Sequence, residues 1–471
     1  MMCNPTNSFP DFSGIFGDKR IDNRANRLLK VLTQGRSSSI RQITSSEGEQ
    51  KSFYRLFNNE SFSEKLITDA IVNRCGQLCD GRHLLCIQDT SEFNLSSQDG
   101  RIKPSTGLGK TTKEGILGFM LHSSIVIDPD KDTALGYSHI KVWDRKLDAP
   151  DKHKRNYGQQ PIAEKESYKW MVASEDSKQL LSAAQTITII ADRESDIYDL
   201  LATVPDERTH LLIRSNHNRR IAGGGTLTHH LDTMASLHDY SLMVRGDVRK
   251  KIEKRTVDME LKWSKVSIVK PSRCKDKNLA DSVEVYVVEA KEKGKVKGIH
   301  WRIITTHPVE SAIDAMQVIE WYKHRWYIEQ VHRLLKTEGF RIESSQLEQG
   351  WAIRKLTLLA MMAVLRILQM MLAYEDGNEQ PVDEVFTKDE QACLQMINEQ
   401  EQGKTDKLKN TSDPTTLKWA TWIIARLGGW KGYKSSRKPG PIVFQKGLVK
   451  FYHIYQGWNL YKNKTIIVSS Q

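Results

Sequence analysis

The feature of the sequence that most constrains its fold is a change of hydrophobic period near residue 83. From that point, short apolar runs alternate with patterns typical of helices, such as the one at residues 162–181. The clearest apolar runs cover residues 84–87, 121–127, 186–191 and 211–213. Strands that alternate with helices form sheets covered by helices. The sequence therefore predicts an α/β core.

A second group of β patterns lies between about residues 237 and 304. Charged turns separate its amphipathic runs, which cover residues 241–244, 256–269, 283–288 and 301–305. Strands with one buried and one solvated face are typical of antiparallel sheets. We therefore expect an antiparallel β insertion within the α/β core.

Helical patterns flank this core. Residues 21–74 carry apolar residues at helical spacing, and a basic helical segment begins at residue 417. Two pairs have the spacing of a capping box, namely Ser46 with Glu49 and Ser61 with Glu64. At about 150 residues per domain, the length predicts about three domains. We expect a helical domain at 1–75, an α/β domain at 76–375 and a helical domain at 376–471.

Residues 356–374 form the most apolar stretch and are nearly long enough to span a membrane. Because Arg366 and Gln369 lie inside it, a buried amphipathic helix is the better interpretation, and no membrane span is expected. Residues 1–20 lack the continuous apolar segment of a secretion signal. We expect the protein to stay in the cytoplasm.

Positive charge exceeds negative charge, since Lys+Arg number 70 and Asp+Glu number 58, a net charge of +12. Such a balance suits nucleic acid, an acidic membrane surface or an ordinary basic enzyme. Two basic clusters, at 323–336 and 431–438, are interleaved with aromatic residues. Phosphates and bases fit that combination better than lipid does, although any one cluster is more commonly a solvated surface.

The six cysteines are too few for a disulfide framework. Cys75 and Cys79 are one helical turn apart and Cys86 is near, which raises the question of a zinc site. No histidine or second cysteine pair completes four ligands at a usual spacing. We expect packed thiols.

Two aspartates end apolar strand patterns: Asp89 follows residues 84–87, and Asp192 follows residues 186–191. One such aspartate is most often a turn or helix-cap residue. Two at the ends of neighbouring strands would share a crevice, where like charges repel unless a cation lies between them. Carboxylate oxygens suit Mg²⁺ or Mn²⁺ in that position.

A third acid lies in a helical pattern at residues 310–336. Four residues of this pattern share one helical face, namely Tyr322, Arg325, Glu329 and Lys336. An ordinary exposed pair between Arg325 and Glu329 also explains the spacing, and it would stabilise the helix by only about 0.3–0.5 kcal/mol. The helix alone leaves both interpretations open.

Together, the Tyr-x2-Arg-x3-Glu-x6-Lys pattern and the upstream Asp89 and Asp192 resemble the DDE transposases of the Tn-five type, the insertion-sequence-four family. Further segments resemble motifs of that family, at residues 192–197, 164–170 and 424–429 and, more loosely, at 17–20 and 49–57. The resemblance implies an RNase H-like mixed sheet with the β insertion before the catalytic Glu. It also implies a DNA-end-binding domain at 1–75 and a dimerisation domain at 376–471.

The resemblance further implies the roles of single residues. Asp89, Asp192 and Glu329 would be both the catalytic residues and the ligands of two Mg²⁺ ions, for which Mn²⁺ can substitute. The implied DNA-binding residues are Tyr322, Arg325, Lys336, Arg333, His332, Trp301, Arg214 and Arg20. Trp301 would stack on a base flipped out of the duplex, and its alternative is core or edge packing. The alternative for His332 is a solvated helix residue.

We therefore expect a DNA transposase that binds inverted terminal repeats of double-stranded DNA, cleaves at the element ends and transfers the 3′-hydroxyl strands to target DNA. It would act on the nucleoid as a homodimer, paired through apolar helical residues that include Trp419, Trp422 and Ile423, although such a stripe also suits an ordinary core. Two alternatives remain: a catalytically silent DNA-binding regulator of the same family, and an RNase H-fold nuclease without strand transfer. The intact acids argue against a silent relative.

Overall fold

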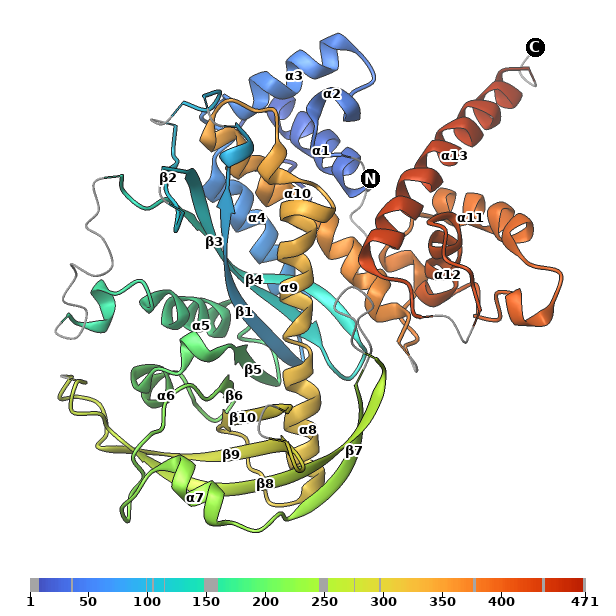
Figure 1. The fold of residues 1–471 in the computed structure, drawn as a ribbon. Coiled ribbons are helices and arrows are strands. Elements are labelled where there is room, and N and C mark those ends of the chain that lie inside the picture. The colour runs from blue at the N-terminus through green and yellow to red at the C-terminus, as the bar shows by residue number, and fades with distance from the viewer. Residues whose placement is uncertain are drawn as a thin grey trace. The chain divides into compact units, whose positions relative to one another are not determined.

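The structure, a computed structural model, describes residues 8–34, 37–98, 100–103, 106–113, 115–147, 160–244, 253–274, 276–295, 298–375, 378–433 and 437–468. The chain has a mixed α/β fold with helices and strands throughout (Figure 1). It divides into two compact units. The strand-rich unit comprises residues 80–89 and 150–326, and the helix-rich unit comprises residues 1–79, 90–149 and 327–471.

The strand-rich unit is built on one mixed sheet. The strands lie in the order β1 (His83–Asn94, of which the first half belongs here), β5 (Thr186–Ala191), β6 (Thr209–Arg214), β10 (His300–Thr305), β9 (Ser282–Glu292), β8 (Arg255–Val269) and β7 (His238–Val244). β5 is parallel to both β1 and β6, and every pair from β6 to β7 is antiparallel. The predicted antiparallel β insertion is therefore present, joined to a parallel core.

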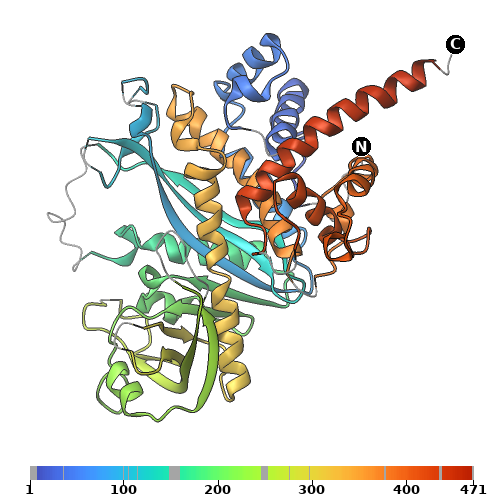
Figure 2. The same cartoon turned by 45° about the vertical axis from the view of Figure 1, so that its right-hand side comes forward.

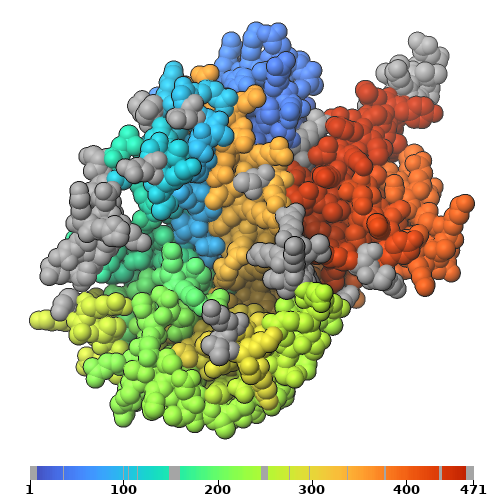
Figure 3. All heavy atoms as spheres, in the orientation of Figure 1, coloured from blue at the N-terminus to red at the C-terminus, as the bar shows by residue number. Residues whose placement is uncertain are grey.

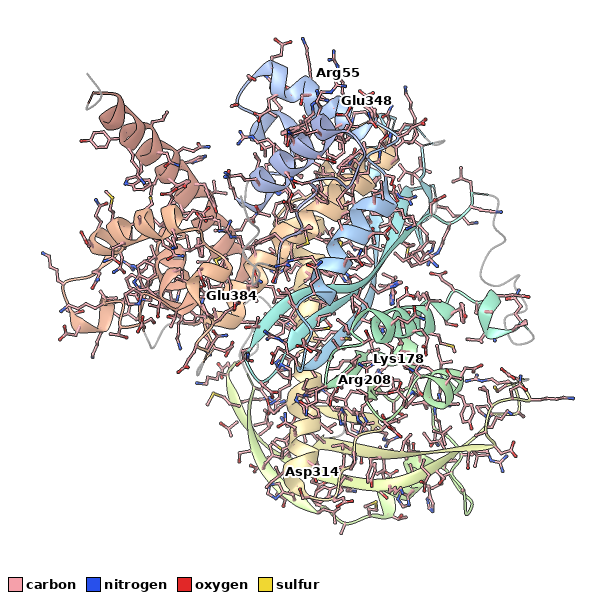
Figure 4. All side chains as sticks on the ribbon, turned by 180° about the vertical axis from the view of Figure 1, so that it is seen from behind. Arg55, Lys178, Arg208, Asp314, Glu348 and Glu384 are labelled. Carbon is pink, nitrogen blue, oxygen red and sulfur yellow. The ribbon has the colours of Figure 1, made fainter. Side chains whose placement is uncertain are left out.

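Among the described residues, the α-helices of this unit are α5 (Tyr168–Leu180), α6 (Tyr198–Thr203), α7 (Leu227–Thr233) and α8 (Ala312–Lys323). α8 lies against the curved strands β8 and β9 (Figure 1) and buries Ala315, Val318 and Ile319. It begins at a complete capping box between Ser311 and Asp314, the residue labelled at this helix end in Figure 4. Two reciprocal bonds at the helix start offset its unpaired N–H groups.

Two cationic side chains that are labelled in Figure 4, Lys178 and Arg208, connect the end of α5 to the loop before β6. Lys178 Nζ donates to the Val204 carbonyl at 2.8 Å, and Arg208 Nη1 donates to the Leu181 and Ala184 carbonyls at 3.2 Å each. Cations at a helix C-terminus satisfy carbonyls that lack partners within the helix. These bonds join the C-terminal end of α5 to the segment between α6 and β6.

The helix-rich unit contains the N-terminal helices, a hairpin and the C-terminal helices. Its helices are α1 (Lys19–Thr33), α2 (Ile40–Ile43), α3 (Glu47–Phe57), α4 (Glu64–Gly76), α9 (Trp326–Arg333), α10 (Gly350–Ala373), α11 (Lys388–Glu401), α12 (Leu417–Leu427) and α13 (Pro441–Val468). Its strands are the second half of β1, β2 (Gly109–Lys110), β3 (Leu117–Asp128) and β4 (Thr133–Trp143). The sequence pattern did not predict β4, which pairs with β3. Most of its residues are buried, polar and apolar alike.

α10 is the centre of the helix-rich unit. By length and composition it could cross a membrane, but its most apolar window is entirely buried inside the protein. The helix is buried all round rather than amphipathic, because Arg366 and Gln369 find hydrogen-bond partners in the interior. Arg366 donates to the Thr33 and Val385 carbonyls, and Gln369 donates to the Ala134 carbonyl at 3.0 Å. Buried polar groups are tolerated when they are paired in this way.

Two local predictions about helices need correction. Ser46 caps α3 as expected, but α4 is capped by Ser63, whose hydroxyl accepts the Leu66 N–H at 3.2 Å, and not by Ser61. In α12, Trp419 and Trp422 are buried in the unit's own core, as is Ile423. These α12 side chains therefore cannot form a pairing face. The division into functional domains at residues 75 and 375 stays a prediction.

Candidate active site

Asp89 and Asp192 lie at the same level of the strand-rich sheet. The last paired residues of the parallel strands β1 and β5 are Ile87 and Ile190, and each aspartate follows its isoleucine by two residues. Side chains alternate between the two faces of a strand, and neighbouring strands are about 4.8 Å apart. The backbone therefore directs both carboxylates to the same face, on adjacent strands.

Asp89 is not at the end of its strand, which corrects the sequence prediction. β1 continues to Asn94 and leaves the ladder with β5 at Ile87. Asp192 does end β5 and caps the short turn that follows, where its Oδ1 accepts the Glu194 N–H at 2.8 Å. The hydroxyl of Ser195 donates to the Asp192 carbonyl at 2.7 Å, so the turn is closed by its own side chains.

Cationic side chains surround this pair of acids. Arg325 Nη1 lies 3.9 Å from Asp89 Oδ2. Arg214, at the end of β6, is half-buried, and its pKa is lowered by burial and by the nearby charges of Arg193 and Arg325. Guanidinium groups remain charged in proteins. Mutual repulsion among them favours an anion at this position.

Tyr322 lies among these charges with a buried hydroxyl. Only 6% of the residue is exposed, and burial raises its pKa to about 12 although Arg325 and Arg214 act in the opposite direction. Within the described part of the chain, the hydroxyl has no hydrogen-bond partner. A buried polar atom without a partner is costly and rare, so a ligand oxygen is the kind of group that would complete it.

Glu329 is exposed on α9 and belongs to the helix-rich unit. The continuous helix predicted at 310–336 is wrong: α8 ends at Lys323, a turn with bonds from His324 to Trp321 and from Arg325 to Tyr322 follows, and α9 begins at Trp326. Tyr322 and Arg325 therefore do not share one uninterrupted face with Glu329. The convergence of Glu329 with the two aspartates stays a prediction.

The basic residues after Glu329 are held by neighbours in the helix-rich unit. Lys336 lies in a π-helical turn, and its Nζ donates to Ser91 Oγ at 3.2 Å and lies 5.8 Å from the Phe93 ring centre. Arg333 pairs with Glu338 at 2.5 Å. His332 is buried, and burial lowers its pKa to about 3, so it is neutral and is not a solvated helix residue.

Trp301 lies in β10, between β6 and β9, and is half-buried. Its neighbours His300 and Arg302 both bind Glu289 of β9, at 2.8 and 2.7 Å. Arg214 Nη2 donates to the His300 carbonyl at 3.1 Å, which joins the Trp301 strand to the cationic group. Trp301 is therefore not at the sheet edge, and its stacking role stays a prediction.

Arg20 lies in the first turn of α1, largely exposed, and pairs with Asp18 at 3.3 Å. An exposed pair of this kind adds little stability and can be replaced by a phosphate contact at little cost. The arginine is available to an anionic partner.

The chemistry of the acids fits a hard divalent cation, because carboxylate oxygens are its preferred ligands. Within the described residues, no three His, Cys, Asp or Glu side chains already stand close enough together to hold a metal ion. Cys75, Cys79 and Cys86 are buried thiols. The two aspartates alone supply two carboxylates, and Mg²⁺ commonly binds through one or two carboxylates beside substrate phosphates.

Three contributors to this region were not among the predicted site residues. Arg193 follows Asp192 directly and is exposed. Lys169, in a segment already singled out as a motif, lies 3.8 Å from Glu194 and 3.9 Å from Glu166. Arg219 forms a buried pair with Asp196. No local pattern marks Arg219, because its partner lies 23 residues earlier in the chain.

Comparison with known families identifies two matched segments. Residues 13–62 match the transposase DNA-binding family, and residues 173–366 match the transposase DDE domain. The second range contains Asp192 and Glu329, and Asp89 lies before it. Among solved structures, the chain is similar to a cryo-EM structure of the piggyBac transposase synaptic complex with hairpin DNA, with 10% sequence identity, a TM-score of 0.35, and coverage of 75% of this chain and 71% of that chain. With a DNA-binding domain ahead of a DDE domain that cleaves DNA and transfers strands, this protein is a DNA transposase.

Proposed function

We propose that the protein is a DDE transposase of the Tn-five type that binds inverted terminal repeats, cleaves at the element ends and joins the freed 3′-hydroxyl ends to target DNA. The observation that carries this proposal is that Asp89 and Asp192 each follow the last paired residue of the parallel strands β1 and β5 by two positions. A cluster of arginines lies beside them. An RNase H-like core belongs to the proposal. It is supported by the β3–β4 hairpin and α5, which come between β1 and β5 in the chain.

In the proposed site, Asp89, Asp192 and Glu329 would hold two divalent cations, Mg²⁺ or Mn²⁺. Such ions supply Lewis-acid activation of a water and of the phosphodiester. Arg325 pairs with the Asp89 carboxylate at 3.9 Å. The same residues then serve cleavage by water and attack by a 3′-hydroxyl, because both are displacements at phosphorus.

The cationic group is proposed to hold the DNA backbone. Arg325 and Arg214 can each bind a phosphate through two N–H donors, and the Tyr322 hydroxyl can donate a further bond. The buried Tyr322 hydroxyl would gain the partner that it lacks within the described protein. Lys336, Arg333 and Arg20 would extend the contact along the DNA, while buried His332 has no charge to offer a phosphate.

A homodimer on paired ends also belongs to the proposal. Since Trp419 and Trp422 are buried in α12, a different surface must pair two copies. The C-terminal end of α13 extends away from α11 and α12 (Figures 2 and 3) and exposes apolar side chains at Ile454, Leu460 and Tyr461. Large exposed apolar side chains on one helix are typical of an interaction surface. A second copy of this helix is the proposed partner.

The test is incubation of the purified protein with terminal-repeat DNA and Mg²⁺, followed by a gel that separates nicked, hairpin and joined products. We expect Asp89→Asn and Glu329→Gln to abolish cleavage and to leave end binding intact, because they remove metal ligands and not phosphate contacts. Cleavage that survives either change would overturn the metal assignment. Nicked product without joined product in the wild type would instead favour a nuclease, and binding without any cleavage would favour a silent regulator.

A further inference from the structure

A buried ion pair joins the segment after β5 to the segment after β6. The side chains of Asp196 and Arg219 are 0% and 4% exposed. Asp196 Oδ1 accepts Arg219 Nε at 2.7 Å and Nη2 at 2.5 Å, and the Asp196 carbonyl accepts Nη2 at 2.7 Å. Burying an ion pair costs free energy unless both partners are fully hydrogen-bonded. Here the planar guanidinium of Arg219 donates to both the carboxylate and the backbone carbonyl of Asp196.

The second oxygen of Asp196 holds the backbone of the other segment. Asp196 Oδ2 accepts the N–H groups of Asn216 and His217 at 2.7 and 2.9 Å. Both oxygens of this carboxylate are therefore used to join two stretches of chain. A charged acceptor makes these backbone bonds about twice as strong as neutral ones.

The two joined segments carry residues of the proposed site. Asp192 precedes Asp196 by four residues, and the short turn between them is closed by Asp192 itself. Arg214 precedes Asn216 by two residues, at the end of β6. The ladder between β5 and β6 ends at the pair Ala191 with Ile213, one residue before Asp192 and Arg214. Beyond that point, the Asp196–Arg219 pair continues the connection.

Packing does not replace this connection. A cavity of about 770 Å³ borders the same segments, and its lining includes Arg193, Asp196, Tyr198, His217 and Arg219. Interiors are normally close-packed, and packing is what restricts most buried chain segments. The turn after Asp192 borders this cavity, and the ion pair is one of the contacts that hold it there.

We propose that Asp196 and Arg219 are positioning residues, which fix Asp192 and Arg214 relative to each other at the ends of β5 and β6. This inference rests on the proposed function for the role of Asp192 as a metal ligand. Residues that orient metal ligands typically change metal affinity or activity by about 10- to 100-fold when they are replaced. The pair acts through Asp192 and touches neither DNA nor metal.

The test measures Mn²⁺ binding to the whole protein by electron paramagnetic resonance, together with hydrogen exchange of the peptide 192–199. For Arg219→Gln and Asp196→Asn we expect Mn²⁺ affinity to fall by about 10- to 100-fold and exchange of that peptide to accelerate at least tenfold. Arg219→Lys should give a Mn²⁺ affinity and an exchange rate between those of these variants and those of the wild type. The reason is that an ammonium group cannot bind the carboxylate and the carbonyl in one plane. A folded Arg219→Gln with wild-type Mn²⁺ affinity would overturn the proposal.

Two further variants separate positioning from general stability. Glu292→Gln breaks another carboxylate–arginine pair in the same unit, in which Glu292 is buried and Arg255 is partly exposed, and should leave both readouts unchanged. The double variant Asp196→Leu with Arg219→Met removes the charges together, a change that buried pairs often tolerate. It should fold and still lose Mn²⁺ affinity, and normal affinity there would refute the proposal. If the Asp192→Asn variant binds Mn²⁺ as tightly as the wild type, the proposed function fails. The hydrogen-exchange measurement still tests the Asp196–Arg219 pair in that case.

Discussion

Acid should destabilise the strand-rich unit through His307. The imidazole Nε2 lies 2.8 Å from Thr188 Oγ1, and the ring stacks on His210 at 4.0 Å between centres. Burial, with the neighbouring His210 and His83, lowers the pKa of His307 to about 3 from an ordinary 6.5. The folded protein therefore holds this histidine neutral at any pH above about 3.

The sign of the effect follows from this lowered pKa. The unfolded chain binds a proton as pH falls through 6.5, and the folded chain does not, so stability is complete above 6.5 and is lost progressively below it. At pH 5.5 the loss from one such histidine is about 1.4 kcal/mol. For a unit of this size, that corresponds to a fall in Tm of roughly 3–5 °C.

The assay is thermal and urea unfolding followed by circular dichroism at pH 7.5 and pH 5.5. Between pH 7.5 and pH 5.5, we expect the free energy of unfolding to fall by about 1.4 kcal/mol less in His307→Gln than in the wild type, because glutamine does not titrate. This difference does not depend on the stability of the variant at pH 7.5. The control is His453→Gln, at an exposed position on α13, which should keep the wild-type pH dependence. Equal pH dependence in the wild type and His307→Gln would refute the assignment.

Further predictions concern DNA binding and helix packing. Arg325→Ala and Lys336→Ala should each weaken end binding and make the slope of log affinity against log salt shallower by about one, since each removes about one phosphate contact, and an unchanged slope in filter-binding titrations would contradict this. In α13, a Cβ added to Gly447 would lie 1.9 Å from the Ile424 carbonyl, whereas nothing lies within 4 Å of Gly457. Gly447→Ala should therefore lower Tm, and Gly457→Ala should raise stability by up to about 1 kcal/mol, as measured by thermal unfolding.

Local pattern was sufficient for much of the fold. The apolar runs predicted the strands β1, β3, β5 and β6, and the amphipathic runs predicted β7 to β10, because strand periodicity is encoded residue by residue. Pattern failed where burial depends on distant partners. β4 is buried with polar side chains that only β3 and neighbouring helices can satisfy, and α10 is buried on the faces that carry Arg366 and Gln369.

The sequence by itself determined which chemical groups are present: two aspartates after apolar strands, a third acid in a helix, and arginines near them. Only the tertiary structure decided that Asp89 and Asp192 share one level of a sheet, that the helix after the insertion breaks between Tyr322 and Glu329, and that Asp196 meets Arg219. Strand register and buried pairing join residues far apart in the chain. Their energy depends on which segments exclude water together, and no local period of the sequence carries that information.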